Sequence, residues 1–234
     1  MEIILIKEYG EDMDNKHEQS YADIFNRKLE EKAGPDKFHA FSVDGQDRDA
    51  GCDYVITDSD RFAIIEFKWQ EKDLPSEAKK GRRRELCQEL EKNEEMKNLH
   101  DRCHFISWSD SIQGKSQTNI YRKEICIGDI FGAGCGFGAA GASTESRVGL
   151  GEFAEEFFEK KRSLKRRKFE KYLAWVMTET SESKSSTVEL IAYREKSDDV
   201  FTFRMNSLSE VKAWMKTYKV EPRNKQKKRK DNKF

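Results

Sequence analysis

Residues 51–70 read Gly-Cys-Asp-Tyr-Val-Ile-Thr-Asp-Ser-Asp-Arg-Phe-Ala-Ile-Ile-Glu-Phe-Lys-Trp-Gln, and this stretch decides the fold. Its two apolar runs, at 54–56 and 62–67, are rich in β-branched and aromatic residues, which favour strands. The polar residues 58–61 between them are typical of a tight turn. The stretch therefore predicts a β-hairpin whose turn is centred at 59–60.

The predicted hairpin places three ionisable side chains on one face. Asp53 lies opposite Glu66, and directly opposed residues have Cβ atoms roughly 4.5–5.5 Å apart. Lys68, two residues beyond Glu66, points to the same face. Opposed carboxylates on buried strands repel, and a cation relieves this conflict. Mg²⁺ binds one or two carboxylates together with water and substrate phosphate, so we expect a Mg²⁺ site here, with Mn²⁺ as the alternative ion. A lysine beside such a site can orient or deprotonate a water for metal-assisted phosphodiester hydrolysis.

At these residues the sequence resembles the PD-(D/E)xK, or restriction-endonuclease-like, nuclease superfamily. The family pattern is an acid at the start of one strand, followed in the next strand by Glu/Asp-x-Lys. Cys52-Asp53 matches the first half and Glu66-Phe67-Lys68 matches the second, with Cys52 in place of the proline of the family name. The resemblance implies that Asp53 and Glu66 bind the metal, that the Phe67 carbonyl is a further ligand, and that Lys68 orients or activates the attacking water.

Other acidic residues compete for roles at this site. Members of the superfamily often carry an acid on their first helix that points into the metal site, and the resemblance implies Glu18 for that position. The alternative is a plain glutamate that the helix dipole favours in the first turn. Asp49 is a rival ligand, although no strand is predicted to position it. A purely structural interpretation makes Asp53 a strand-end residue and Glu66 and Lys68 an ion pair.

Clusters of basic residues predict a nucleic-acid substrate, because binding of the phosphate backbone is electrostatic. The first cluster comprises Lys79, Lys80, Arg82, Arg83 and Arg84, and two more lie at 160–168 and 223–230. The first follows the motif closely, so we expect it to grip the strand beside the metal together with Gln70. A solvated helix face is the alternative for each cluster.

These observations predict a Mg²⁺-dependent DNA endonuclease for restriction, phage defence or DNA processing, a context that only the resemblance supplies. Two alternatives are an RNase and a nucleic-acid-binding protein that does not cleave, or cleaves only with a partner. A homodimer is also left open. The formal net charge of zero gives no support for nucleic acid, and only the distribution of charge does.

Elements around the hairpin agree with the resemblance. The sequence predicts a helix over 15–33, a strand over 37–43, the two hairpin strands, a helix over 75–99 that Gly81 could break, and a strand over 103–108. This order gives an α/β (α+β) fold with an αβββαβ core and a mixed central sheet, as the superfamily implies. A short strand is also predicted at 1–7.

The second half of the chain is predicted to elaborate this core. We expect a strand within 119–130, a Gly-rich flexible loop, a long helix over 152–178, and a β-hairpin followed by a helix. The G-x-G-x-x-G string at 136–141 lacks the following helix that a phosphate-binding loop needs. The predicted division is a nuclease core at 1–110, an extra strand and Gly-rich loop at 111–151, a C-terminal helix, hairpin and helix at 152–220, and a basic disordered tail at 221–234.

Composition bounds the remaining possibilities. The five cysteines form no C-x-x-C pair, so we expect reduced thiols and a cytoplasmic location. Apolar runs are too short to span a membrane, so no membrane partner is expected. The group at 100–104, with two histidines, an aspartate and a cysteine, fits no closed structural zinc pattern.

Overall fold

The computed structural model describes residues 2–34, 37–43, 52–58, 60–110, 114–132, 135–137, 139–179, 188–193 and 200–205, with side chains from 17 to 179. Its helices are α1 (Glu2–Ala33), η1 (Glu71–Lys79), α3 (Gly81–Lys92), α4 (Glu94–Cys103), α5 (Tyr121–Ile125), α6 (Gly128–Phe131), η2 (Thr144–Ser146), α7 (Leu150–Phe158) and α8 (Arg166–Glu179). Its strands are β1 (His39–Ser42), β2 (Tyr54–Asp58), β3 (Arg61–Gln70), β4 (His104–Asp110), β5 (Lys115–Ile120), β6 (Leu164–Lys165), β7 (Val188–Tyr193) and β8 (Val200–Met205).

One mixed sheet forms the centre of the molecule. Its strand order is β5-β4-β3-β2-β1-β7-β8, and β6 adds to β3 outside this path. The strands β1, β2 and β3 pair antiparallel, whereas β3 and β4 pair parallel. The predicted hairpin register is confirmed, with Tyr54 opposite Ile65 and Asp58 opposite Arg61. The fold is therefore mixed α/β, as predicted.

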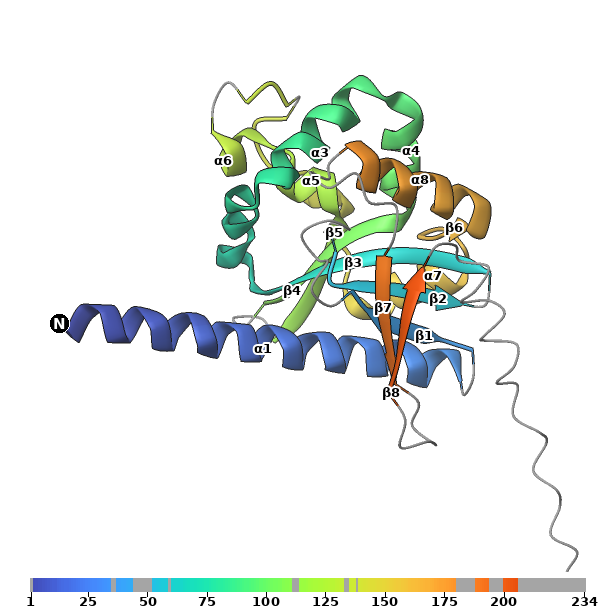
Figure 1. Ribbon diagram of the computed structural model, residues 1–234, viewed down its shortest axis with the longest axis horizontal. Coiled ribbons are helices and arrows are strands. Elements are labelled where there is room, and N and C mark those ends of the chain that lie inside the picture. The colour runs from blue at the N-terminus through green and yellow to red at the C-terminus, as the bar shows by residue number, and fades with distance from the viewer. Residues whose placement is uncertain are drawn as a thin grey trace, which may run out of the picture.

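Helices cover both faces of the sheet, as Figure 1 shows with α1 along one side and α3, α4 and α8 along the other. On the α1 face, the Phe25 ring lies 5.1 Å from Phe67 and 5.6 Å from Phe153 of α7. On the opposite face, Phe169 of α8 stacks 5.4 Å from Phe62. Successive residues of a strand point to opposite faces, so Phe67 faces α1 while Glu66 faces η1 and α3. Burial on both faces explains why β3 is almost continuously apolar.

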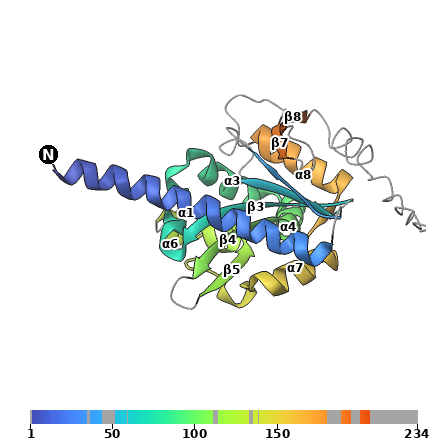
Figure 2. The ribbon, with the colours of Figure 1, turned by 90° about the horizontal axis from the view of Figure 1, so that it is seen from below.

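The N-terminal prediction is partly wrong. The expected helix over 15–33 is confirmed, but α1 begins at Glu2, so residues 2–7 are helical rather than a strand. Figure 2 shows the N-terminal part of α1 extending beyond the rest of the molecule. A short apolar run is compatible with both structures, and periodicity alone does not separate them.

The helix predicted over 75–99 is three helical segments, η1, α3 and α4, that follow one another between β3 and β4. The chain is extended at Lys80 and again at Asn93, which separates them. The Asn93 side chain accepts a hydrogen bond from the Met96 N–H at 3.1 Å and so caps α4. The core order of helix, strands, helix and strand is nevertheless observed.

Two predictions in the second half need correction. The strand expected within 119–130 ends at Ile120, and the short helices α5 and α6 follow it. The long helix expected over 152–178 is two helices, because α7 ends at Phe158 and α8 begins at Arg166. Lys160 has a φ of 70°, a left-handed conformation that a helix cannot contain. The chain between the two helices instead forms β6, and its Leu164 pairs with Phe62 of β3.

The predicted C-terminal hairpin is confirmed as β7 and β8, and Ile191 of β7 pairs with Ser42 of β1. The hairpin thus extends the central sheet. Described parts of the Gly-rich segment form turns and one isolated bridge, between Ile127 and Ala139, and only the three-residue η2 follows them. The rival ligand Asp49, the final helix from Ser207 and the basic tail lie outside the described residues.

The prediction of reduced thiols is wrong for two of the cysteines. Cys87 of α3 and Cys126, just after α5, form a disulfide with their Cα atoms 5.3 Å apart. The partners are 39 positions apart in the chain, so only the packing of α3 against α5 brings them together. Cysteine usage therefore no longer supports the predicted cytoplasmic location. Within the described residues, no helix is long and apolar enough to cross a membrane.

Candidate active site

Lys68, near the end of β3, lies at the centre of a group of acidic residues. Its Nζ is 2.9 Å from Glu66 Oε1, 3.2 Å from Glu77 Oε1 and 3.8 Å from Glu18 Oε1. The same ammonium donates a hydrogen bond to the Phe67 carbonyl at 2.7 Å. The predicted placement of Glu66 and Lys68 on one face is confirmed, and α1 brings Glu18 to the same point.

Two fully buried carboxylates share the cations of this site. Glu66 lies 2.5 Å from Lys80 Nζ and 3.1 Å from the Arg83 guanidinium. Glu77 lies 2.9 Å from Lys80 Nζ and 2.9 Å from Arg83 Nε, and it accepts the Tyr121 hydroxyl at 2.7 Å. We call Glu66, Glu77, Lys68, Lys80 and Arg83 the charged cluster. Buried charges are strongly unfavourable unless they are paired in this way.

Local structure after β3 explains how these residues meet. The Gln70 backbone N–H donates to Asp73 Oδ2 at 3.0 Å, which starts η1 directly after the strand and turns the chain back. Glu77, Lys80 and Arg83 then follow at intervals of three residues. Glu77 belongs to η1, Lys80 is the extended residue that follows it, and Arg83 lies in the first turn of α3, yet all three side chains reach the same point. One side of η1 and the start of α3 therefore faces Glu66 on β3.

Asp53 precedes β2 and turns its carboxylate toward β3, where Oδ2 accepts the Phe67 backbone N–H at 2.6 Å. The residue keeps some exposed surface, but burial of the carboxyl group, followed by the nearby charge of Glu66, raises the pKa of Asp53 to about 8. Asp53 therefore keeps its proton at neutral pH. The predicted repulsion between Asp53 and Glu66 is relieved here by that proton and by the cations around Glu66.

Electrostatics keep Lys68 charged. Burial alone would lower the pKa of Lys68, but the acids around it, Glu66 first, outweigh burial and raise the pKa well above its ordinary value. Burial alone would raise the pKa of Glu77, but Arg83, Lys68 and Lys80 outweigh it and lower the pKa well below its usual range. A charged Lys68 can donate hydrogen bonds and balance negative charge. Orienting a water and deprotonating it both stay predictions for Lys68.

The donor atoms fit a hard divalent cation, although the site is arranged around ammonium groups. The acids near Lys68 are Glu18, Asp53, Glu66 and Glu77, and carboxylate oxygens are the ligands that Mg²⁺ prefers. In the described part of the chain, no three acidic, histidine or cysteine groups converge closely enough to hold a metal ion as they stand. The Phe67 carbonyl, a predicted ligand, accepts its hydrogen bond from Lys68. Glu77 Oε1 is buried and has no hydrogen bond to the described residues, and it faces the ammonium groups of Lys68 at 3.2 Å and Lys80 at 2.9 Å, so cations already gather at this oxygen.

The residues predicted to contact substrate have three kinds of environment. Lys80 and Arg83 point into the charged cluster, whereas Lys79 and Arg84 are exposed. Arg84 lies over the Phe131 ring and donates to the Phe131 carbonyl at 3.2 Å. Gln70 and Arg82 are half-buried. Two residues of the predicted basic cluster, Lys80 and Arg83, therefore form ion pairs inside the protein.

Sequence reasoning missed Glu77 and Tyr121. The repeated spacing of Glu77, Lys80 and Arg83 could have identified a common face directed at the motif. No sequence pattern indicated Tyr121. Its hydroxyl reaches Glu77 only because β5 pairs with β4 and carries the chain back to this part of the sheet.

Comparisons with known proteins identify no relative of this chain. No protein-family model, no curated protein and no solved structure matches this chain. The function must therefore be inferred from the residues of the site and their geometry.

Proposed function

We propose that this protein is a divalent-metal-dependent endonuclease of the restriction-endonuclease-like superfamily that hydrolyses phosphodiester bonds in DNA. The observation that carries the proposal is the convergence of Asp53, Glu66, Lys68 and Glu18 at one end of β3. The order α1, β1, β2, β3, helical segments and β4, with its mixed strand directions, agrees with the αβββαβ core that the resemblance implies.

In this proposal Asp53 and Glu66 hold the metal, and Lys68 orients the reacting groups. A bound Mg²⁺ or Mn²⁺ would supply an activated water and neutralise charge on the scissile phosphate. The charged ammonium of Lys68 donates hydrogen bonds to that water or to a phosphate oxygen. Glu18, 3.8 Å from Lys68 Nζ, helps to fix the direction of the ammonium. In this proposal Lys79, which is exposed, contacts the nucleic-acid backbone.

One observation supports a second candidate, a nucleic-acid-binding protein that does not cleave. The cations of the charged cluster already pair with both buried carboxylates, so the cluster is also a sound structural arrangement. Cleavage of RNA rather than DNA uses the same groups and is a further outcome of the experiment below.

The deciding experiment is incubation of the purified protein with plasmid DNA, linear DNA and RNA, in Mg²⁺, Mn²⁺ or EDTA. We expect cleavage of DNA with either metal and none in EDTA. Asp53→Asn and Lys68→Ala should each lower the cleavage rate by about a hundredfold to ten-thousandfold, the range that positioned catalytic groups contribute. Asn replaces Asp53 well because the native carboxyl group is protonated in the folded protein.

Lys92→Ala is the matched control, because the Lys92 side chain is 67% exposed and pairs only with Glu89 among the described residues. It should cleave as the wild type does. Full cleavage by Asp53→Asn would show that the site is misassigned. Binding of DNA without cleavage in either metal would favour the second candidate.

A further inference from the structure

We propose that Glu66 and Glu77 form a divalent-cation site in which the ammonium group of Lys80 takes the place of the metal ion, and that Lys80 must leave before the metal binds. The inference rests on the proposed function for the identity of the cation. It adds Glu77 as a metal ligand outside the recognised motif and gives Lys80 the role of a competitor for the metal.

The position of Lys80 is the first observation. Its Nζ lies 2.5 Å from Glu66 Oε1 and 2.9 Å from Glu77 Oε1, so it bridges two fully buried carboxylates. The enclosed Lys68 contacts the same two oxygens from within the core, at 2.9 Å and 3.2 Å. The geometry at Glu77 Oε1 does not amount to a hydrogen bond with any described residue. Attraction to that oxygen is therefore electrostatic and not directional, which is the kind of contact a metal ion can replace.

Exposure distinguishes Lys80 from the other cations of the charged cluster. The Lys80 side chain is 29% exposed, compared with 5% for Lys68 and 2% for Arg83. Lys80 also occupies the extended connection between η1 and α3, with φ −85° and ψ 101°. Its side chain can therefore turn toward solvent without displacing a helix, whereas Lys68 and Arg83 are enclosed by the sheet and helices.

The ligand chemistry fits a hydrated divalent ion. Mg²⁺ and Mn²⁺ are bound by oxygen, and Mg²⁺ typically uses one or two protein carboxylates and keeps several waters. Glu66 and Glu77 supply two carboxylates. The Lys80 side chain is partly exposed, so water can reach the position that its ammonium group occupies. A released Lys80 would lie beside the metal with its charge available to a phosphate oxygen of the substrate.

The test is calorimetric titration of the full-length protein with Mn²⁺ in the absence of nucleic acid. Lys80→Met should bind Mn²⁺ at least about tenfold more tightly than the wild type, or about 1.4 kcal/mol, because the competing ammonium is removed. Glu77→Gln should bind about tenfold more weakly, because a charged ligand becomes neutral. Lys92→Met, which alters an exposed lysine at the end of α3, should leave the affinity unchanged.

Unchanged Mn²⁺ affinity in Lys80→Met, or no Mn²⁺ binding by any variant, would overturn the proposal. Far-ultraviolet circular dichroism establishes that each variant is folded, and if Glu77→Gln is not, the comparison of Lys80→Met with Lys92→Met still decides. Tighter binding in Lys80→Met without cleavage by the wild type would support this metal site while removing the endonuclease proposal. Cleavage that is lost in Asp53→Asn, together with an Mn²⁺ affinity that Lys80→Met does not change, would support the endonuclease proposal and remove this metal site.

Discussion

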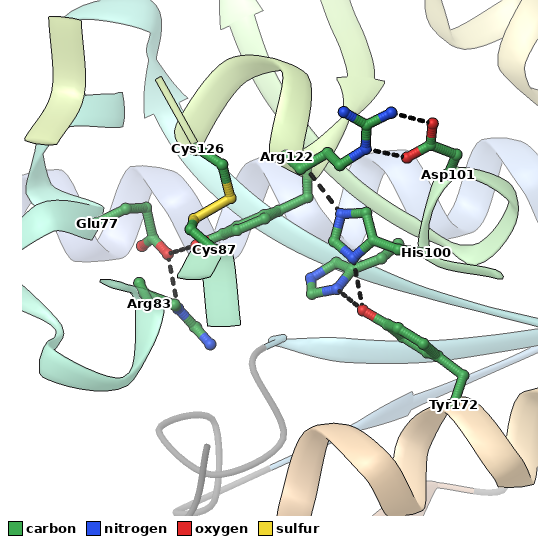
Figure 3. Close-up of a disulfide and its surroundings, with 10 residues drawn as sticks. Glu77, Arg83, Cys87, His100, Asp101, Arg122, Cys126 and Tyr172 are labelled. Atoms are coloured by element: carbon green, nitrogen blue, oxygen red, sulfur yellow. Dashed lines mark hydrogen bonds and ion pairs between the residues drawn. A yellow bond between two sulfur atoms is a disulfide. The ribbon is translucent and has the colours of Figure 1, made fainter. Parts of the chain in front are cut away.

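Two buried polar groups lie side by side on the same face of the sheet, and they differ in how they are stabilised. One is the charged cluster. The other, which we call the histidine group, consists of His100, His104 and Tyr172 (Figure 3). Tyr121 joins them, because its hydroxyl donates to Glu77 at 2.7 Å while its ring stacks 4.5 Å from His104.

The histidine group is a closed, uncharged network. The Arg122 backbone N–H donates to His100 Nε2 at 3.1 Å, so the proton of a neutral His100 is on Nδ1. That Nδ1–H faces the Tyr172 hydroxyl at 2.6 Å, and the hydroxyl in turn lies 2.8 Å from His104 Nδ1. The chain of hydrogen bonds therefore satisfies these ring nitrogens without any charge. The histidines that could have indicated zinc are used for packing.

This difference in charge indicates that the charged cluster, and not the histidine group, is suited to binding an ion. The charged cluster consists of ions that compensate one another, and its Lys80 reaches solvent. Such a cluster changes when a new ion arrives, whereas a fully satisfied neutral network is rigid. The four predictions that follow test this contrast through protein stability.

The largest effect should come from Arg83, whose guanidinium pairs with both buried carboxylates. Arg83→Leu should lower the free energy of unfolding by about 3–5 kcal/mol, because it removes the most deeply buried of the cations that compensate Glu66 and Glu77. Urea denaturation measures the change. The control is Arg84→Leu at the next, exposed position, where the loss of the contacts with Phe131 should cost only about 1 kcal/mol. Equal losses at the two positions would mean that the charged cluster contributes nothing special to the fold.

The disulfide should have the second largest effect, since it ties α3, one turn after Arg83, to the chain just after α5 (Figure 3). Replacing both cysteines with serine should cost about 2–4 kcal/mol of unfolding free energy, as expected for a cross-link that closes a loop of intermediate length. Thermal and urea unfolding with and without dithiothreitol measure it. Cys135→Ser is the control, and an effect of reductant that survives in the double serine variant would contradict the assignment.

The third test removes the hydroxyl at the centre of the histidine group. Tyr172→Phe leaves buried ring nitrogens of His100 and His104 without their partner and should cost about 1–3 kcal/mol. Tyr54→Phe, which removes a partly exposed hydroxyl bonded to Gln19, should cost about 0.5 kcal/mol. If Tyr172→Phe is as mild as the control, the network is not a stabilising feature of the core.

The smallest effect concerns pH. Burial, followed by the neighbouring His104 and Arg122, lowers the pKa of His100 well below its ordinary value of 6.5. The unfolded chain therefore binds this proton more readily than the folded protein. The resulting stabilisation is present above pH 6.5 and is lost as the pH falls through that value. We expect about 1–2 kcal/mol less stability at pH 5 than at pH 7 from this residue.

Comparison of the wild type with His100→Gln isolates that contribution. The raised pKa of Asp53 acts in the opposite sense, because its stabilisation is lost as the pH rises toward 8, and it is common to both proteins. The wild type should therefore lose about 1–2 kcal/mol more stability than His100→Gln between pH 7 and pH 5, whereas the two pH profiles should run parallel above pH 7. Parallel profiles over the whole range would mean that His100 binds its proton equally well in the folded and the unfolded protein.

Local sequence was sufficient for the elements nearest the motif. The polar turn residues at 58–61 predicted the hairpin register, and the two-residue period of a strand placed Glu66 and Lys68 on one face. Both inferences depend on the two-residue period of a strand, which does not require the rest of the fold. The same reasoning was wrong at 2–7 and at 152–178, where a local pattern was compatible with more than one structure.

Sequence by itself therefore determined the central hairpin, its register and the acidic and basic groups that it carries. Tertiary structure decided their partners. Only the return of η1 and α3 over β3 brings Lys80 and Glu77 to Glu66, and only the packing of α5 adds Tyr121 and the disulfide. The physical reason is that strand register follows from neighbouring residues, whereas the compensation of a buried charge depends on which distant segments cover it.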